Sequence, residues 1–273
     1  MSVVNCNNSN NDNGSNSNNG SSGNTNDGRG RGKGRAEGCM KYEAVVFDLF
    51  GTLVDNFQGS PAEQAYLRMT DILSIDGDAF WPTWRSEPFA TRRADGHYAT
   101  FEDALRDVCR AAGVGYLAER VPAALEFRRR VLGQSMVPRP DTVPTLTVLH
   151  DRGLKIGLVS DCTWEIPECW PQTPMARLVD AAVFSCSAGL KKPDPRIFAL
   201  ICEKLAVEPR QCLYVGDGGS DELAGARRAG MDAVLICVPY ETSAVMSRPW
   251  ARQWEGPRIS SVSEVLELVS AES

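Results

Sequence analysis

Side chains that could perform chemistry follow four separate apolar runs, at the points where strands would end. The four groups are Asp48 with Thr52, Ser160 with Asp161, Lys191 with Lys192, and Asp217 with Asp221 and Glu222. Several carboxylates in one pocket repel each other unless a cation shares the site, and Mg²⁺ prefers such oxygen ligands and also binds phosphate. A lysine in the same place neutralises an anionic transition state, and a serine hydroxyl orients the oxygens of an anion.

Asp48 comes directly after the first of these runs and is followed closely by Gly51. A carboxylate in this position has the chemistry of a covalent nucleophile. Taken alone, an aspartate after a strand is more often a turn former or a helix cap than a nucleophile. The occurrence of all four groups favours the functional interpretation, because the carboxyl ends of parallel strands meet at one edge of a sheet.

The apolar runs predict strands, and the segments between them predict helices. Short apolar runs are typical of strands buried on both faces of a parallel sheet. These runs occupy residues 42–47, 155–159, 181–184, 212–215 and 233–238, and helical spacing covers residues 194–206, 221–229 and 262–269. The alternation of strands and helices predicts an α/β protein with a doubly wound, Rossmann-like parallel sheet.

Composition divides the chain into three predicted regions. These regions are a tail over residues 1–40, a core over residues 41–56 and 138–273, and a helical insertion over residues 57–137. The tail is rich in Asn, Gly and Ser and is expected to be disordered. For this tail, an unstructured linker or a mis-assigned translation start, with the true start at Met40, is favoured over an RNA-binding segment. In the insertion, Pro61 and Pro122 lie at expected helix starts, and Trp81 and Trp84 are expected to pack in its interior.

The overall composition argues against several classes of protein. The 273 residues carry a formal charge of −6, so nucleic acid is not an expected partner of the folded part. The sequence has no apolar run of membrane-spanning length and no secretory signal. The nine cysteines form no Cys-x-x-Cys pair, which argues against a disulfide framework and a structural zinc site. A cytoplasmic protein is therefore expected.

Four motifs give the chain its resemblance to the haloacid dehalogenase-like (HAD) hydrolase superfamily, over residues 41–240. They are Asp48-Leu-Phe-Gly-Thr-Leu-Val-Asp55, Leu158-Val-Ser160, Lys192-Pro-Asp-Pro-Arg-Ile-Phe198, and Val215-Gly-Asp217-Gly-Gly-Ser-Asp221-Glu222. The resemblance implies that Asp48 is the nucleophile and that Ser160 and Lys192 contact the phosphoryl oxygens. It also implies that the insertion is a helical cap, which closes over the site and determines the substrate.

The resemblance further implies a Mg²⁺ site. Its predicted ligands are Asp48, the backbone carbonyl of Phe50, Asp217, and either Asp221 or Glu222. The count back from Gly225-Ala226 favours Glu222, whereas residue type favours Asp221, and both stay open. The predicted substrate contacts are Thr52, Ser160, Asp161, Lys192 and Arg85, the last because dehalogenases of the family bind a carboxylate with a cap arginine.

Phe50 departs from the pattern of the family's phosphatases, which carry an aspartate there as general acid and base. Phenylalanine cannot protonate a leaving alkoxide, a step that contributes about 10²–10⁴-fold to the rate. The same position is aromatic in the family's 2-haloacid dehalogenases, whose halide product needs no proton. Those enzymes work without a metal and lack the acid at the position of Asp217. This chain keeps that acid, which favours a phosphatase, because a Mg²⁺ site is central to phosphoryl transfer.

The sequence therefore favours a Mg²⁺-dependent phosphatase that acts on a small phosphorylated metabolite through an aspartyl phosphate on Asp48. Asp161, next to Ser160, is one hypothesis for a substitute acid; a substrate with a good leaving group, such as an acyl or aryl phosphate, is a simpler explanation. Two alternatives stay open. In a 2-haloacid dehalogenase Asp48 would attack carbon, and a non-catalytic binding protein would keep only the fold. Intact Asp48, Lys192 and Asp217 argue against the second alternative.

Overall fold

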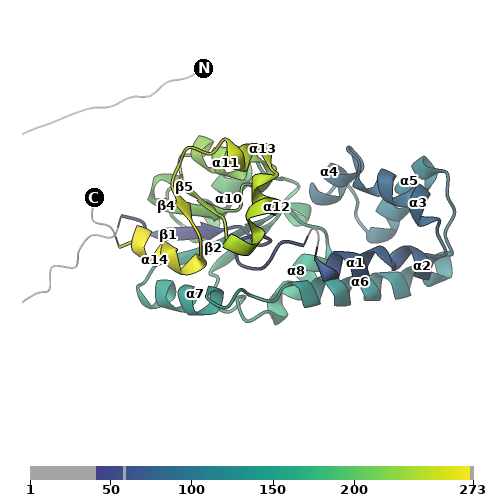
Figure 1. Cartoon of the computed structure of the whole chain (residues 1–273), viewed down its shortest axis with the longest axis horizontal. Coiled ribbons are helices and arrows are strands. Elements are labelled where there is room, and N and C mark those ends of the chain that lie inside the picture. The colour runs from purple at the N-terminus through teal and green to yellow at the C-terminus, as the bar shows by residue number, and fades with distance from the viewer. Residues whose placement is uncertain (1–40, 58–59, 271–273) are drawn as a thin grey trace, which may run out of the picture. The chain divides into compact units, whose positions relative to one another are not determined.

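The computed structural model describes residues 41–57 and 60–270, with a six-stranded parallel sheet at the centre (Figure 1). Its strands are β1 (Ala44–Phe47), β2 (Lys155–Ser160), β3 (Ala181–Phe184), β4 (Cys212–Gly216), β5 (Asp232–Ile236) and β6 (Arg258–Ile259). They lie in the order β3-β2-β1-β4-β5-β6, and neighbouring strands run parallel. The predicted doubly wound α/β fold is confirmed, whereas the predicted tail over residues 1–40 lies outside the described residues.

Helices form a large insertion between β1 and β2 and connect the later strands. Before β2 the chain forms α1 (Pro61–Leu67), α2 (Met69–Leu73), α3 (Gly77–Arg85), α4 (Phe89–Ala94), α5 (Phe101–Ala112), α6 (Val121–Ser135) and α7 (Thr142–Asp151). After β2 it forms α8 (Glu165–Cys169), α9 (Ser185–Ala188), α10 (Pro195–Leu205), α11 (Glu222–Arg228), α12 (Thr242–Met246), α13 (Pro249–Arg252) and α14 (Val265–Leu268). Single 3₁₀ turns occur at Ala118–Arg120, Trp170–Gln172, Pro209–Gln211, Gly219–Asp221, Pro239–Glu241 and Val262–Glu264. No helix in the described ranges has the length and apolar character needed to cross a membrane.

Strand β1 occupies the middle of the sheet, where the chain order changes direction. Its residue Phe47 pairs with Leu158 of β2 on one side and with Val215 of β4 on the other. Because all three strands are parallel and in this register, the residues that follow them emerge at the same edge. Ligand sites of doubly wound sheets lie at such a reversal of strand order.

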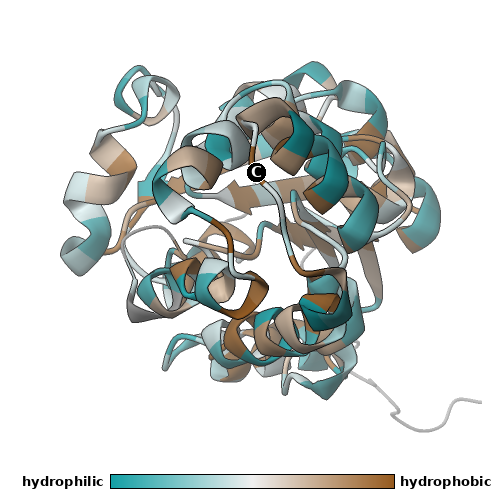
Figure 2. Ribbon diagram, turned by 90° about the vertical axis from the view of Figure 1, so that its right-hand side faces the viewer, coloured by the Kyte–Doolittle hydropathy of each residue, from teal (hydrophilic) through white to brown (hydrophobic). Residues whose placement is uncertain are grey.

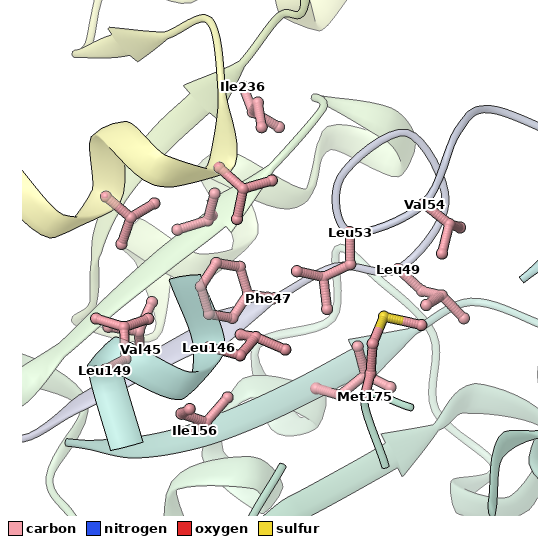
Figure 3. Close-up of a cluster of buried hydrophobic side chains, with 14 of the residues drawn as sticks. Val45, Phe47, Leu49, Leu53, Val54, Leu146, Leu149, Ile156, Met175 and Ile236 are labelled. Atoms are coloured by element: carbon pink, nitrogen blue, oxygen red, sulfur yellow. The ribbon is translucent and has the colours of Figure 1, made fainter. Parts of the chain in front are cut away.

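Alternate residues of β1 point to opposite faces of the sheet and enter two separate apolar cores. Val45 and Phe47 pack with Leu146 and Leu149 of α7, as Figure 3 shows. The intervening residues Ala44 and Val46 pack in a second core together with residues of α10 and α11. In Figure 2 the strands are mostly brown, and the helices around them alternate between teal and brown. Coverage of both faces explains why the strand sequences are apolar runs without alternation.

The insertion, here defined as helices α1–α6, has an apolar core of its own. The buried members of this core include Leu73, Phe80, Trp84, Leu105 and Val108, and Trp81 packs against them. The expected interior packing is therefore confirmed for Trp84, whereas Trp81 is only partly buried against this core. The proline expectations also hold, since Pro61 begins α1 and Pro122 lies in the first turn of α6. The exact boundaries between insertion and core stay a prediction.

Some elements differ from the predicted ones. The helix expected to start at Pro61 is short, because it is interrupted at Arg68, which ends α1 and begins α2. Helix α7 was not expected, because its sequence is rich in Thr and Val and contains Pro144, all weak helix formers. Burial of Leu146 and Leu149 against the sheet overrides that weak propensity. Strand β6 has two residues, too few for any periodic signal.

Leu146 provides a test of the packing between α7 and the sheet, since its side chain is fully buried. We expect Leu146→Ala to lower the free energy of unfolding by about 2–5 kcal/mol, because the core collapses only partly around the lost methyl groups. Val137 is 68% exposed, so Val137→Ala should change it by less than about 0.5 kcal/mol. Equilibrium urea unfolding measures both variants, and equal effects would contradict the described packing.

Candidate active site

Asp48 is the first residue after β1, and the sheet fixes its position. Its backbone N–H donates to the carbonyl of Val215 on β4 at 2.9 Å, and its side chain is almost fully buried. One carboxylate oxygen accepts a hydrogen bond from Lys192 Nζ at 2.5 Å, and the other accepts from Thr52 Oγ1 at 3.3 Å. Three of the predicted site residues therefore meet at the end of the central strand.

The turn after Asp48 requires a glycine for two reasons. Gly51 has a φ of +83°, a conformation that other residues rarely adopt. A Cβ atom at this position would also lie 1.9 Å from Oδ2 of Asp217, which no side chain tolerates. The glycine therefore allows the loop after β1 to approach the carboxylate that follows β4.

Lys192 and Glu222 form a buried ion pair within the site. Lys192 Nζ donates to Glu222 Oε2 at 2.6 Å, in addition to its bond with Asp48. Glu222 also accepts hydrogen bonds from the Tyr214 hydroxyl at 2.8 Å and from the Gly218 backbone N–H at 2.9 Å. Tyr214 was not predicted as a site residue; the one signal for it is a hydroxyl-bearing side chain within the apolar run of β4.

Asp217, directly after β4, is paired with a residue that the sequence did not reveal. Arg248, between α12 and α13, forms an ion pair with Oδ2 of Asp217. The same oxygen accepts from Asn56 Nδ2 at 3.3 Å, and Oδ1 accepts from the Gly219 N–H at 3.0 Å. Arg248 lies beyond the last recognisable motif, so no spacing pattern could connect it to Asp217.

The carboxylates of Asp48, Asp217 and Glu222 form a buried cluster that suits a cation. They offer ligand oxygens that lie within 4.8 Å of one another. Lys192 and Arg248 are the basic side chains paired with them, so the group has a net charge of −1 when all three carboxylates are ionised. Oxygen donors and a negative net charge are what Mg²⁺ requires.

The structure distinguishes the two acids that the sequence left open. Glu222 belongs to the cluster, whereas Asp221 lies outside it and pairs with Arg228 at 3.5 Å. Asp221 also has a φ of +51°, at the start of α11. The geometry therefore favours Glu222 as the further acid of the predicted metal site.

Ser160 is the last residue of β2, which lies on the other side of β1 from β4, and Asp161 follows it directly. Ser160 is buried and lines the same cavity as Asp48. Oδ1 of Asp161 accepts the backbone N–H of Lys192 at 3.0 Å, a contact that joins β2 to the lysine loop. Oδ2 of Asp161 is buried, and among the described residues it has no hydrogen-bond partner.

A cavity of about 570 Å³ connects these residues to the insertion. Its lining includes Asp48, Phe50, Ser160, Asp161, Lys192, Asp217, Glu222 and Arg248 from the core, and Tyr66, Trp81, Trp84, Arg85 and Arg93 from the insertion. Arg85, the cap arginine expected to contact substrate, pairs there with Glu63 at 3.4 Å. Lys191 does not line this cavity, and its Nζ donates to Thr91 Oγ1.

Burial raises the pKa of Asp217, and it raises that of Glu222 from 4.5 to about 8. The folded state therefore binds the Glu222 proton more tightly than the unfolded chain does, so the free energy of unfolding falls as the pH rises from 4.5 toward 8. With EDTA present, we expect the free energy of unfolding of the wild type to fall by on the order of 1 kcal/mol per pH unit in this pH range, relative to that of Glu222→Gln. Urea titrations at several pH values measure this, and a constant difference would contradict the raised pKa.

Comparisons with known proteins show two kinds of relatives. Phosphatase MT3486 of Mycobacterium tuberculosis is 29% identical over 202 residues, which cover 72% of this chain and 88% of that protein. (S)-2-haloacid dehalogenase 4A of Burkholderia cepacia is 27% identical over 201 residues, which cover 71% and 82%. Relatives of both activities therefore match most of the chain.

A solved structure shows a similar fold. The 2-haloacid dehalogenase from Pseudomonas syringae pv. Tomato DC3000 gives a TM-score of 0.61 at 22% identity, with 84% of this chain and 98% of that chain covered. In addition, residues 42–230 match the family model of haloacid dehalogenase-like hydrolases. Because that match spans more than half of the sequence, the chain belongs to the haloacid dehalogenase-like hydrolases.

Proposed function

We propose that this hydrolase is a Mg²⁺-dependent phosphatase that acts on a small phosphorylated metabolite. The observation that carries the proposal is the cluster of Asp48, Asp217 and Glu222, whose ligand oxygens lie within 4.8 Å of one another. Three buried carboxylates paired with two basic side chains favour the addition of one cation. A metal next to a nucleophilic aspartate serves the transfer of a phosphoryl group.

The predicted Mg²⁺ ligands are Asp48, Asp217, Glu222 and the backbone carbonyl of Phe50. When bound there, the ion would neutralise charge on the phosphoryl oxygens. Arg248 occupies one oxygen of Asp217 in the structure, so this side chain would share or give up that oxygen to the metal. Lys192 and Ser160 supply the remaining positive charge and a hydroxyl at the same end of the cavity.

The chemistry proceeds through Asp48. An oxygen of its carboxylate attacks phosphorus in line, the bond to the leaving oxygen breaks, and that oxygen takes the electron pair. Water then attacks the phosphorus of the aspartyl phosphate, which releases inorganic phosphate and restores the carboxylate. Lys192, 2.5 Å from Asp48 Oδ1, orients this carboxylate before the attack.

The leaving oxygen is the point at which this site differs from the pattern of the family's phosphatases. Phe50 lines the cavity and packs edge-on against Phe57, so it offers no proton. Asp161 also lines the cavity, and its buried Oδ2 has no hydrogen-bond partner in the described part of the chain. We propose Asp161 as the substitute acid for substrates whose leaving group needs a proton.

Hydrolysis of 4-nitrophenyl phosphate tests the proposed activity, because an aryl leaving group departs without protonation. We expect turnover with Mg²⁺, loss of that turnover with EDTA, and at least about 10³-fold lower kcat for Asp48→Asn, because the nucleophile is removed. Asp221→Asn is the matched control and should retain turnover, since Asp221 lies outside the cluster. Equal loss in both variants, or turnover that is independent of metal and of Asp48, would contradict the proposal.

A comparison of leaving groups tests the role of Asp161. We expect Asp161→Asn to lower kcat for an alkyl phosphate by about 10²-fold and to leave kcat for the aryl phosphate nearly unchanged, because only the alkoxide needs a proton. The asparagine keeps an oxygen for the Lys192 N–H, so the loop should stay in place. If both substrates respond equally, Asp161 holds the loop and transfers no proton.

A second candidate activity is the hydrolysis of 2-haloacids, which the apolar Phe50 favours because a halide leaves without a proton. The similarity to a 2-haloacid dehalogenase is compatible with it. In that reaction Asp48 would attack carbon and displace halide, and water would hydrolyse the resulting ester. Halide release from 2-haloacids in the presence of EDTA, with no aryl phosphate turnover, would decide for this activity.

A further inference from the structure

The wall of the cavity formed by the insertion contains a buried cation without a counter-ion. Arg93, on α4, is 7% exposed and lines the cavity that also contains Asp48 and Lys192. No ion pair or hydrogen bond joins its guanidinium to any residue within 41–57 and 60–270, and its Nη1 is buried without a partner. The contact that holds the group is a cation–π interaction with Trp84, whose ring centroid lies 3.9 Å from Cζ.

Glu87 and Glu165 interact with Arg93 electrostatically, but neither acid lies within ion-pair distance of its guanidinium. Arg128 and Glu165 form an ion pair with fully buried side chains, and Arg128 also donates to the Tyr66 hydroxyl. Arg85, the other arginine that the insertion contributes to the lining of the cavity, pairs with Glu63 and has a half-exposed side chain. One positive charge therefore remains at the end of the cavity formed by the insertion.

An unpaired buried charge is unfavourable, and binding of an anion removes that penalty. Burial lowers the pKa of Arg93 to about 10, so the group stays protonated at neutral pH. A guanidinium presents parallel N–H donors that match a carboxylate in a bidentate pair. A single positive charge is balanced by a carboxylate rather than by a second phosphate, which carries nearly two negative charges.

We propose that Arg93 binds the carboxylate of a phosphorylated carboxylic acid whose phosphate lies at Asp48. The proposal rests on the proposed phosphatase function for the position of the phosphate. It makes Arg93 a specificity-determining residue and restricts the preferred substrates to small molecules with an anionic group at each end, within a cavity of about 570 Å³. Trp84 covers one face of the guanidinium and thereby positions its N–H groups.

Binding of non-hydrolysable phosphonates tests this subsite without turnover. The ligands are phosphonoacetate, 3-phosphonopropionate and 4-phosphonobutyrate, each compared with its carboxamide, and calorimetry with Mg²⁺ present gives the dissociation constants. For at least one chain length we expect the carboxylate to bind wild type roughly 10- to 100-fold more tightly, the range expected for hydrogen bonds to a charged group. No preference at any length, or no binding at all, would overturn the proposal.

Variants then assign the preference to Arg93. In Arg93→Gln the ratio of the two dissociation constants should fall to about one, whereas Arg110→Gln, at an exposed position of α5, should keep the wild-type ratio. If Arg93→Gln does not fold, Arg93→Lys should reduce the ratio but keep it above one, because it retains the charge and loses the bidentate geometry. A wild-type ratio in the Arg93 variant that folds would overturn the proposal.

The two proposals fail separately. If 4-nitrophenyl phosphate is not turned over but the carboxylate preference depends on Arg93, the proposed phosphatase function is contradicted and the carboxylate subsite is supported. If the aryl phosphate is turned over but no carboxylate preference is found, the proposed phosphatase function is supported and the proposed carboxylate subsite is contradicted.

Discussion

Mutual repulsion among three buried carboxylates is the constraint on which the rest of the site depends. Asp48, Asp217 and Glu222 offer oxygens within 4.8 Å of one another, in a part of the protein from which water is largely excluded. Repulsion at this distance is strong in a low-dielectric interior, so each charge needs a partner. Lys192 bridges two of the carboxylates and Arg248 pairs with the third, so one negative charge stays uncompensated when all three acids are ionised.

This arrangement requires very close approach of backbone segments. Gly51 and Gly216 stand where a Cβ atom would lie 1.9 Å from Asp217 and 2.3 Å from Glu222, respectively. The absence of a side chain therefore allows carboxylates to approach the loops that carry them. The parallel sheet supplies the rigid frame. Strand β1 is hydrogen-bonded to β2 and β4, and the carboxyl ends of all three strands lie at the same edge.

Buried charges also organise the insertion, but there the excess charge is positive, whereas the buried acids of the core are negative. The buried pair of Arg128 and Glu165 joins α6 to α8, and Tyr66 accepts a further hydrogen bond from Arg128. Arg93 then adds a positive charge on the same side of the cavity, where it stacks on Trp84. The cavity thus has an acidic end that suits a metal and a phosphoryl group, and a basic wall that suits a second anion.

The sequence by itself determined that a parallel sheet forms, which apolar runs supply five of its strands, and most of the acidic and basic residues at its edge. These features are local: an apolar run predicts a buried strand, and Asp48, Ser160 or Asp217 comes directly after one. The tertiary structure placed Glu222, and not Asp221, in the carboxylate cluster, since helix α11 begins at Glu222 and this side chain accepts a hydrogen bond from Lys192. It also supplied Tyr214, Arg248 and Arg93, none of which belongs to a motif. Their roles depend on which distant segments pack together, and packing of that kind leaves no periodic pattern along a single chain.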